Sequence, residues 1–473
     1  MVFTPYFHYQ ENLSIMNRVS QVKKFTVIGL HWLVLAICFQ PLALADADLP
    51  LLGENAAINI EEERRLGYSF YRHLLARGIV ETNPVLNNYL NELGARLLIN
   101  IDHRVRNYHF FIVKDFGINA FAVPGGFIGV NIGLILGAQN QNQLASVMAH
   151  EIAHVRLMHS MQAMERTSGG KLSFLSMLAG LLLSGVDPEL GAAVLYGGLA
   201  GSQQAMINFT RDNEYEADRL GIDLLQGGNF DPQGMVDFFR IMDRVSGSSE
   251  FQNIEYLRTH PVNTNRISEA ENRIRQTAVI QGGPDYYTMF KEYLQYVSLN
   301  RMEVIGSDYR KALAQIKAGK FELANQALEK LYQQDSDNIW YGYAYGESFE
   351  YLKQPEKAEQ VYRKLLEIYP DQLSLSLRLT KLLISADDYE SALVIARRLE
   401  KRFPYERSIY KDLADIYEQL DKPVLKMMAE ADYHLIAGNI EHAIGLYETI
   451  IGSAKSDNAT RSRAQARLEL LKG

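Results

Sequence analysis

Two histidines and a glutamate in the middle of the chain have the spacing of a metal-dependent hydrolase. They occur in His150-Glu151-Ile152-Ala153-His154, an H-E-x-x-H pattern. Residues four apart lie one turn apart on one face of a helix, so both imidazoles can close on one metal ion. Glu151 lies about 100° further round the helix, where it can take a proton from a water that zinc has acidified. The pattern predicts two zinc ligands and a general base, although paired histidines also occur as ordinary surface or core residues.

The residues that precede this pattern favour a buried helix. Gln143 to Ala149 contain no glycine or proline and carry apolar residues at helical spacing, which predicts a helix over about 141–163. In a continuous helix His159, five residues after His154, points away from the face of His154. A lesser alternative is that His159 supports one of the ligands.

A third ligand is needed, because a zinc hydrolase usually keeps three protein ligands and one open position. The best candidate segment is 211–221, Arg-Asp-Asn-Glu-Tyr-Glu-Ala-Asp-Arg-Leu-Gly. Glu214 and Asp218 share one helical face, so Glu214 can reach the metal while Asp218 accepts the free N–H of a ligating histidine. Arg211 opens the segment and is expected among the residues that support the ligands, whereas Glu216 faces solvent. The alternative is an ordinary charged helix.

Residues 108–130 change from helical to strand periodicity. Residues 108–113, 119–124 and 125–130 read as short strands, the last two around a Pro-Gly-Gly turn. Pro124 denies its strand a full ladder of hydrogen bonds, which predicts an edge strand. An edge strand beside a zinc helix can accept an extended peptide as a further strand, so its residues are predicted to bind substrate: Asn119, Ala120, Phe121 and Ala122. A plain hairpin is the alternative.

These motifs together resemble the gluzincin metallopeptidase family that includes the CAAX prenyl endopeptidase and the heat-shock protease HtpX. The resemblance rests on the H-E-x-x-H pattern, on Glu214-Tyr215-Glu216-Ala217-Asp218 and on residues 119–126. It implies that Glu214 is the third ligand of one zinc ion per chain. It also implies that Thr259-His260-Pro261 lies near the site. Prenyl-protease relatives carry several transmembrane helices and this sequence does not, which argues against a prenylated substrate.

His260 is a candidate catalytic residue with two possible roles. The proline that follows it predicts a loop or the start of a helix. An imidazole on such a loop can fill the open zinc position and block water, or it can polarise the substrate carbonyl. The alternative is a helix-capping turn with a solvated histidine.

The first 45 residues are predicted to be a cleavable signal peptide. Lys23 and Lys24 precede an apolar run, and Ala43-Leu44-Ala45 forms an A-x-A cleavage site. Cleavage there removes Cys38, the only cysteine, so the mature chain has no disulfide. The formal net charge is −8, and removal of this segment leaves −10. Such an acidic chain is a poor candidate for binding nucleic acid or an anionic membrane surface.

Two apolar stretches, 172–184 and 190–200, follow the zinc helix. Asp187-Pro188-Glu189 separates them, and each is too short to span a membrane. We expect helices that lie over the active site as a lid. Core packing is an equal alternative, and contact with a membrane or a hydrophobic client is a third.

From about residue 309 the sequence repeats with a period of 34. Ala324, Ala358 and Ala392 are 34 residues apart, as are Pro370 and Pro404. A 34-residue helix-turn-helix period is the tetratricopeptide pattern, whose stacked repeats bind extended protein segments. Ala443 interrupts the count, which predicts an additional helix near 406–421.

The predicted architecture is an α+β zincin-like metallopeptidase domain over 46–300, mostly helical with a small edge sheet. An all-α tetratricopeptide-repeat superhelix over 301–473 follows. With the signal peptide, this arrangement resembles periplasmic members of the family that act in outer-membrane β-barrel assembly. The resemblance implies a periplasmic zinc metalloendopeptidase and chaperone, with peripheral contact at the outer membrane. Its clients would be outer-membrane β-barrel proteins, and its repeats would dock on the barrel-assembly machinery. The alternatives are a latched or non-proteolytic adaptor and a processing peptidase of one exported substrate.

Overall fold

The structure is a computed structural model that describes residues 60–101, 108–159, 162, 203–246, 255–275, 286–299, 302 and 305–472. The predicted signal peptide and the apolar stretches at 172–184 and 190–200 lie outside these residues. Within the described ranges, no helix combines the length and apolar character that crossing a membrane requires.

A three-stranded sheet lies at the centre of the first half of the chain. Its order is β1 (His109–Val113), β3 (Phe127–Asn131), β2 (Ala120–Val123), with β1 parallel and β2 antiparallel to β3. The predicted edge strand is therefore found as β2. The Pro-Gly-Gly turn is a short 3₁₀ segment, η2 (Pro124–Gly126), in which Gly125 has φ = 80°. This left-handed conformation favours glycine.

Helix α3 (Ile60–Ala76) packs against that turn. A Cβ at Gly67 would lie 1.8 Å from the carbonyl oxygen of Pro124, and one at Gly125 would lie 2.8 Å from that of Glu63. The buried Glu63 carboxylate accepts the Gly125 amide at 3.2 Å. Helix α3 therefore fixes the turn that joins the edge strand to the sheet.

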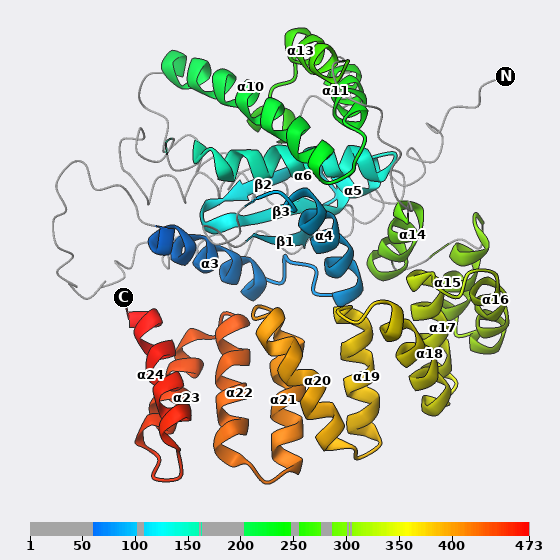
Figure 1. Cartoon of the computed structure of the whole chain (residues 1–473), viewed down its shortest axis with the longest axis vertical. Coiled ribbons are helices and arrows are strands. Elements are labelled where there is room, and N and C mark those ends of the chain that lie inside the picture. The colour runs from blue at the N-terminus through cyan, green and yellow to red at the C-terminus, as the bar shows by residue number, and fades with distance from the viewer. Residues whose placement is uncertain are drawn as a thin grey trace, which may run out of the picture. The chain divides into compact units, whose positions relative to one another are not determined.

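Helix α4 (Pro84–Leu97) follows, where the Asn83 side chain accepts the Val85 amide at 3.0 Å and Pro84 takes the first helical position. After β3 come α5 (Ile132–Gly137) and α6 (Gln141–Arg156), which carries the H-E-x-x-H pattern. This helix ends seven residues earlier than predicted. Helix α6 contacts β2, α10 (Gln203–Gly227) and α11 (Gln233–Ser246) (Figure 1). The short α12 (Glu255–Thr259) and α13 (Thr264–Ile274) complete this part.

The second half of the chain is a stack of antiparallel helix pairs (Figure 1). The three alanines at the 34-residue period, Ala324, Ala358 and Ala392, are fully buried, as small residues at helix-packing points should be. The predicted additional helix is α21, and α22 packs against both α21 and α23. The helices are α14 (Tyr287–Ser298), α15 (Asp308–Lys317), α16 (Phe321–Gln334), α17 (Ile339–Tyr351), α18 (Pro355–Ile368), α19 (Leu373–Ser385), α20 (Tyr389–Arg402), α21 (Arg407–Gln419), α22 (Pro423–Ile436), α23 (Ile440–Gly452) and α24 (Asn458–Lys472).

The repeats share apolar cores with the first half of the chain. Tyr89 of α4 stacks on Phe290 of α14 at 4.3 Å between ring centroids and meets Trp340 of α17 at 5.8 Å. Further along, Tyr405 packs within 5.9 Å of the Phe127 ring of β3. Because aromatic pairs bury large areas, these contacts make the two halves one packed unit.

Candidate active site

Two adjacent helices bring the predicted ligands together. Helix α6 presents His150 and His154 on the face that packs against α10, which presents Glu214. The helices approach closely at Gly221, where a Cβ would lie 3.5 Å from the backbone nitrogen of His150. The four-residue spacing and the close helix packing therefore place three ligand side chains at one point.

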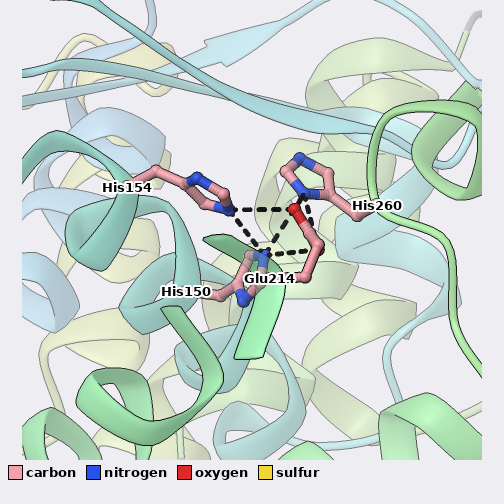
Figure 2. A group of neighbouring side chains, drawn as sticks. All are labelled: His150, His154, Glu214 and His260. Carbon is pink, nitrogen blue, oxygen red and sulfur yellow. Dashed lines mark hydrogen bonds and ion pairs between the residues drawn. The ribbon is translucent and has the colours of Figure 1, made fainter. Parts of the chain in front are cut away.

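The donor atoms form a compact group (Figure 2). The Nε2 atoms of His150 and His154 are 3.0 Å apart, and a carboxylate oxygen of Glu214 lies 3.3 Å from each nitrogen. Nδ1 of His260 lies 3.2 Å from His150 Nε2 and 3.0 Å from Glu214 Oε1. All four donors lie within 4.8 Å of one another. The structure therefore adds His260 to the three predicted ligands.

The separations among His150, His154 and Glu214 fit one tetrahedral metal ion. Ligand atoms that bind zinc at roughly 2.0–2.1 Å stand about 3.3 Å apart at the corners of a tetrahedron. Three imidazoles and one carboxylate, all buried, are also donors that a divalent transition metal prefers. His150, His154 and Glu214 would hold the ion, and His260 lies beside His150 and Glu214.

Glu151 lies beside this group without joining it. Its carboxylate is buried, and Oε1 lies 3.3 Å from Nε2 of His260. Burial raises the pKa of Glu151, while His260, His150 and the backbone amide of Ala122 on the edge strand partly offset the increase. Glu151 is thus positioned between the candidate metal site and β2, as a proton acceptor for hydrolysis would be.

Asp218 supports His150 as predicted from the four-residue spacing. One carboxylate oxygen lies 2.9 Å from Nδ1 of His150. Because that nitrogen is held by a carboxylate, Nε2 is directed at the ligand group. Burial tends to lower the pKa of His150, but Glu214 and Asp218 outweigh it and raise the pKa to about 10. Burial lowers the pKa of His154 to about 3. Glu214 and Asp218 therefore stabilise a positive charge at the His150 ring, and a bound metal ion can supply that charge.

Arg266 of α13 was missed by the sequence reasoning. Its side chain is 1% exposed and donates to both carboxylate oxygens of Asp218 at 2.7 and 2.8 Å. It also lies 2.9 Å from Glu214 Oε2 and donates to the Pro261 carbonyl at 2.7 Å. One guanidinium thus pairs with both Glu214 and Asp218 and fixes the loop that carries His260. The one sequence signal near Arg266 was the Thr-His-Pro motif, which ends five residues earlier at Pro261.

Arg211 and His159 lie differently from what the sequence predicted. Arg211 is exposed, and within the described residues no hydrogen bond or ion pair joins it to the ligand group. His159 does not point away from His154, and that expectation is wrong. Helix α6 ends at Arg156, Met158 takes a left-handed conformation with φ = 61°, and the ring of His159 folds back. Its Nδ1 then lies 3.0 Å from Nδ1 of His154.

The residues predicted to bind substrate lie on or beside the edge strand. Asn119 and Ala120 are buried, and the carbonyl of Asn119 accepts the Asn131 amide at 3.0 Å. The Phe121 ring covers Gly129 and packs against Phe70 and Phe111. The strand therefore offers its backbone, rather than the Phe121 side chain, to the side of the active site.

Comparison with known proteins places this geometry in a family. Residues 84–274 match Peptidase family M48. The chain is also 30% identical over 480 residues to the Beta-barrel assembly-enhancing protease of Escherichia coli strain K12, with 96% of this chain and 97% of that protein covered. The chain belongs to peptidase family M48. It is therefore a metalloprotease, and the predicted gluzincin resemblance is confirmed.

Other relatives extend the comparison. The Beta-barrel assembly-enhancing protease of Yersinia pestis is 30% identical over 449 residues, which cover 90% of this chain and 91% of that protein. The Mitochondrial metalloendopeptidase OMA1 of Schizosaccharomyces pombe is 25% identical over 234 residues, which cover 49% of this chain and 66% of that protein. Residues 342–371, which include α17 and α18, match a Tetratricopeptide repeat. The predicted fold class, a metallopeptidase followed by tetratricopeptide repeats, is confirmed.

Proposed function

We propose that this chain is a periplasmic zinc metalloendopeptidase and chaperone that acts in the assembly and quality control of outer-membrane β-barrel proteins, where it degrades misassembled clients. The observation that carries the enzymatic part is the buried group of His150, His154 and Glu214 with Glu151 beside it. The client class follows from relatives named Beta-barrel assembly-enhancing protease that align along nearly the whole chain.

The chemistry assigned to the site is hydrolysis of a peptide bond. Zinc held by His150, His154 and Glu214 would supply Lewis acidity toward the water and the scissile carbonyl. Glu151 accepts the proton of the attacking water and passes it to the leaving amine. Asp218 holds His150 in the tautomer that directs Nε2 at the ion, and Arg266 balances the charge of Asp218.

The edge strand positions the substrate in this proposal. Hydrogen-bonded and non-hydrogen-bonded pairs alternate along an antiparallel ladder, and Asn119 forms a hydrogen bond with Asn131 of β3. The backbone groups of Ala120 and Ala122 therefore face away from β3. An extended peptide can add to this edge once the Ala122 amide leaves the Glu151 carboxylate, which brings the peptide backbone beside Glu151. Side chains along β2 are small or packed inward, so the strand selects extended conformation more than sequence.

We further propose that His260 is a latch on this site. Its Nδ1 lies 3.2 Å from His150 Nε2 and 3.0 Å from Glu214 Oε1, and we assign it to the position that a hydrolase keeps for water and substrate. Arg266 and the Tyr256 carbonyl, which accepts the His260 amide at 2.8 Å, hold the residue there. His260 has to withdraw before a peptide reaches Glu151. The contact between the Tyr256 amide and the Ile118 carbonyl, at 3.2 Å, links this latch to the segment that leads into β2.

The tetratricopeptide repeats are assigned to client capture and to docking on the barrel-assembly machinery. Stacked helix pairs present an extended surface that suits segments of another protein. A latched chain that only holds clients through its repeats is the second candidate function. The position of His260 beside the metal ligands favours this second function.

The test is to incubate the purified chain with an unfolded outer-membrane β-barrel protein and, as a control, with an unfolded protein of another fold. The proposal predicts zinc-dependent cleavage at several sites, preferentially in the barrel protein, and faster cleavage by His260→Ala. Slower cleavage by His260→Ala would assign that residue to transition-state stabilisation. A single sharp product would indicate a processing peptidase. If neither the unsubstituted chain nor His260→Ala cleaves the barrel protein, and both suppress its aggregation, the chain is the non-proteolytic adaptor.

A further inference from the structure

A fourth histidine, His159, touches the ligand group from outside. His159 follows the end of α6, and its side chain is buried. Its Nδ1 lies 3.0 Å from Nδ1 of His154, with the two rings 5.0 Å apart and steeply inclined. On its other side, Nε2 of His159 lies 3.5 Å from a carboxylate oxygen of Glu216 on α10. His159 therefore bridges a candidate ligand and a carboxylate.

The backbone is bent to make this contact. In a continuous helix, residues five apart point in different directions. Here Met158 has φ = 61°, a conformation that L-residues other than asparagine and aspartate rarely adopt. The Met158 side chain is 41% exposed, so its own packing does not account for the strained conformation. The left-handed residue turns the chain so that the His159 ring meets the His154 ring.

The direction of the hydrogen bonds follows from counting protons. A histidine that binds a metal through Nε2 is neutral and carries its proton on Nδ1. His154 Nδ1 therefore donates, and Nδ1 of His159 has to accept. A neutral His159 then carries its own proton on Nε2, which faces Glu216. His150 has the corresponding support from Asp218, whereas the acceptor for His154 is an imidazole.

We infer that His159 is the positioning residue for His154, holding its ring and tautomer for metal binding, and that Glu216 orients His159 in turn. This inference rests on the proposed role of His154 as a metal ligand. It assigns to Glu216, whose side chain is 59% exposed and which the sequence marked as solvated, a function in the site. Outer partners of metal ligands set affinity as well as geometry.

The experiment measures metal affinity in the full chain. Zn²⁺ and Co²⁺ are titrated into the metal-free protein in competition with a chromophoric chelator, and the Co²⁺ absorption spectrum reports ligand geometry. The inference predicts that His159→Leu weakens binding about 10–100-fold, as expected for loss of an outer partner. His159→Asn, whose side-chain oxygen can accept at the position of Nδ1, should recover most of the affinity and the spectrum. Glu216→Gln should give a smaller loss than His159→Leu.

Met158 offers a matched pair that leaves both histidines in place. Met158→Gly, which adopts positive φ freely, should bind Zn²⁺ as the unsubstituted chain does. Met158→Val, a β-branched residue that resists this conformation, should weaken binding. This pair keeps the test decisive if His159→Leu does not fold. The melting temperature of each metal-free variant is measured alongside.

Two results would overturn the inference. One is unchanged Zn²⁺ affinity in His159→Leu. The other is an equal loss in His159→Asn and His159→Leu that tracks a fall in the melting temperature of the metal-free protein, which would make His159 a packing residue only. Failure of the proposed function looks different, because the unsubstituted chain would then bind neither Zn²⁺ nor Co²⁺.

Discussion

Two arginine–aspartate pairs join α13 to α10, and they differ mainly in burial. Arg266 meets Asp218 at 2.7 and 2.8 Å, and the side chains are 1% and 7% exposed. Arg273 meets Asp223 at 2.8 and 2.9 Å, but these side chains are 40% and 52% exposed. The chain thus contains its own control for the energetic role of Arg266.

Replacement of Arg266 by methionine should destabilise the protein strongly. It breaks a buried ion pair, which costs about 3–5 kcal/mol, because Asp218 then keeps only His150 beside it and Glu214 loses a neighbouring charge. Arg273→Met should cost about 0–1 kcal/mol, because an exposed pair gains little in water. The free energy of unfolding is measured in urea with a chelator present, and hydrogen exchange of the α10 amides reports the local effect.

A second substitution separates charge from packing. Asp218→Asn in the Arg266→Met background removes the uncompensated charge and should recover part of the lost stability. Arg266→Met should also loosen the His260 loop, because the bond to the Pro261 carbonyl is lost. Equal effects of Arg266→Met and Arg273→Met would refute the reasoning, since burial would then not decide the strength of these pairs.

Three further predictions follow from the packing, the titration and the metal site. Gly67→Ala should destabilise the protein by about 1–3 kcal/mol and reduce peptide cleavage, because its Cβ would strike the Pro124 carbonyl. Gly445→Ala in α23, where nothing lies within 4 Å of the new Cβ, should stabilise the protein by about 0.5–1 kcal/mol. Equal shifts in the melting temperatures of the two variants would contradict this. Burial raises the pKa of Asp412 to about 7, so the folded state retains a proton that the unfolded state loses, and the free energy of unfolding should fall by roughly 4 kcal/mol between about pH 4 and 7. Asp412→Asn should abolish that part of the pH profile. An unchanged profile in this variant would exclude the buried carboxyl as its source. Removal of zinc should lower stability by about 4 kcal/mol relative to zinc at a thousand times its Kd, and equal melting temperatures with and without chelator would count against a metal ion held by the folded chain.

Local spacing predicted the part of the site that lies on continuous helices. His150 and His154 on α6, and Glu214 and Asp218 on α10, are each four residues apart, so helical periodicity placed each pair on one face. The edge strand was predicted for the same kind of reason, because Pro124 limits the hydrogen bonds of its neighbours. The 34-residue period of the sequence predicted that Ala324, Ala358 and Ala392 pack between the helices of the repeats.

Contacts that depend on where a helix ends, or on packing between distant segments, were not predicted. His159 was misplaced because the turn at Met158 carries neither the glycine nor the asparagine that marks most left-handed residues. Arg266 lies in a helix of mostly charged and polar residues, and its burial arises from two carboxylates 48 and 52 residues earlier in the chain. No periodicity within α13 distinguishes it from Arg273.

The measurement that tests the central claim most directly compares the unsubstituted chain with Glu151→Gln. Bound metal is quantified in each protein, and cleavage of an unfolded protein is followed under the same conditions. We predict one zinc ion per chain in both, and cleavage that falls about 10²–10⁴-fold in Glu151→Gln, since that residue accepts the proton without binding the ion. Undiminished cleavage by Glu151→Gln, or absence of bound metal from the active unsubstituted chain, would contradict the account.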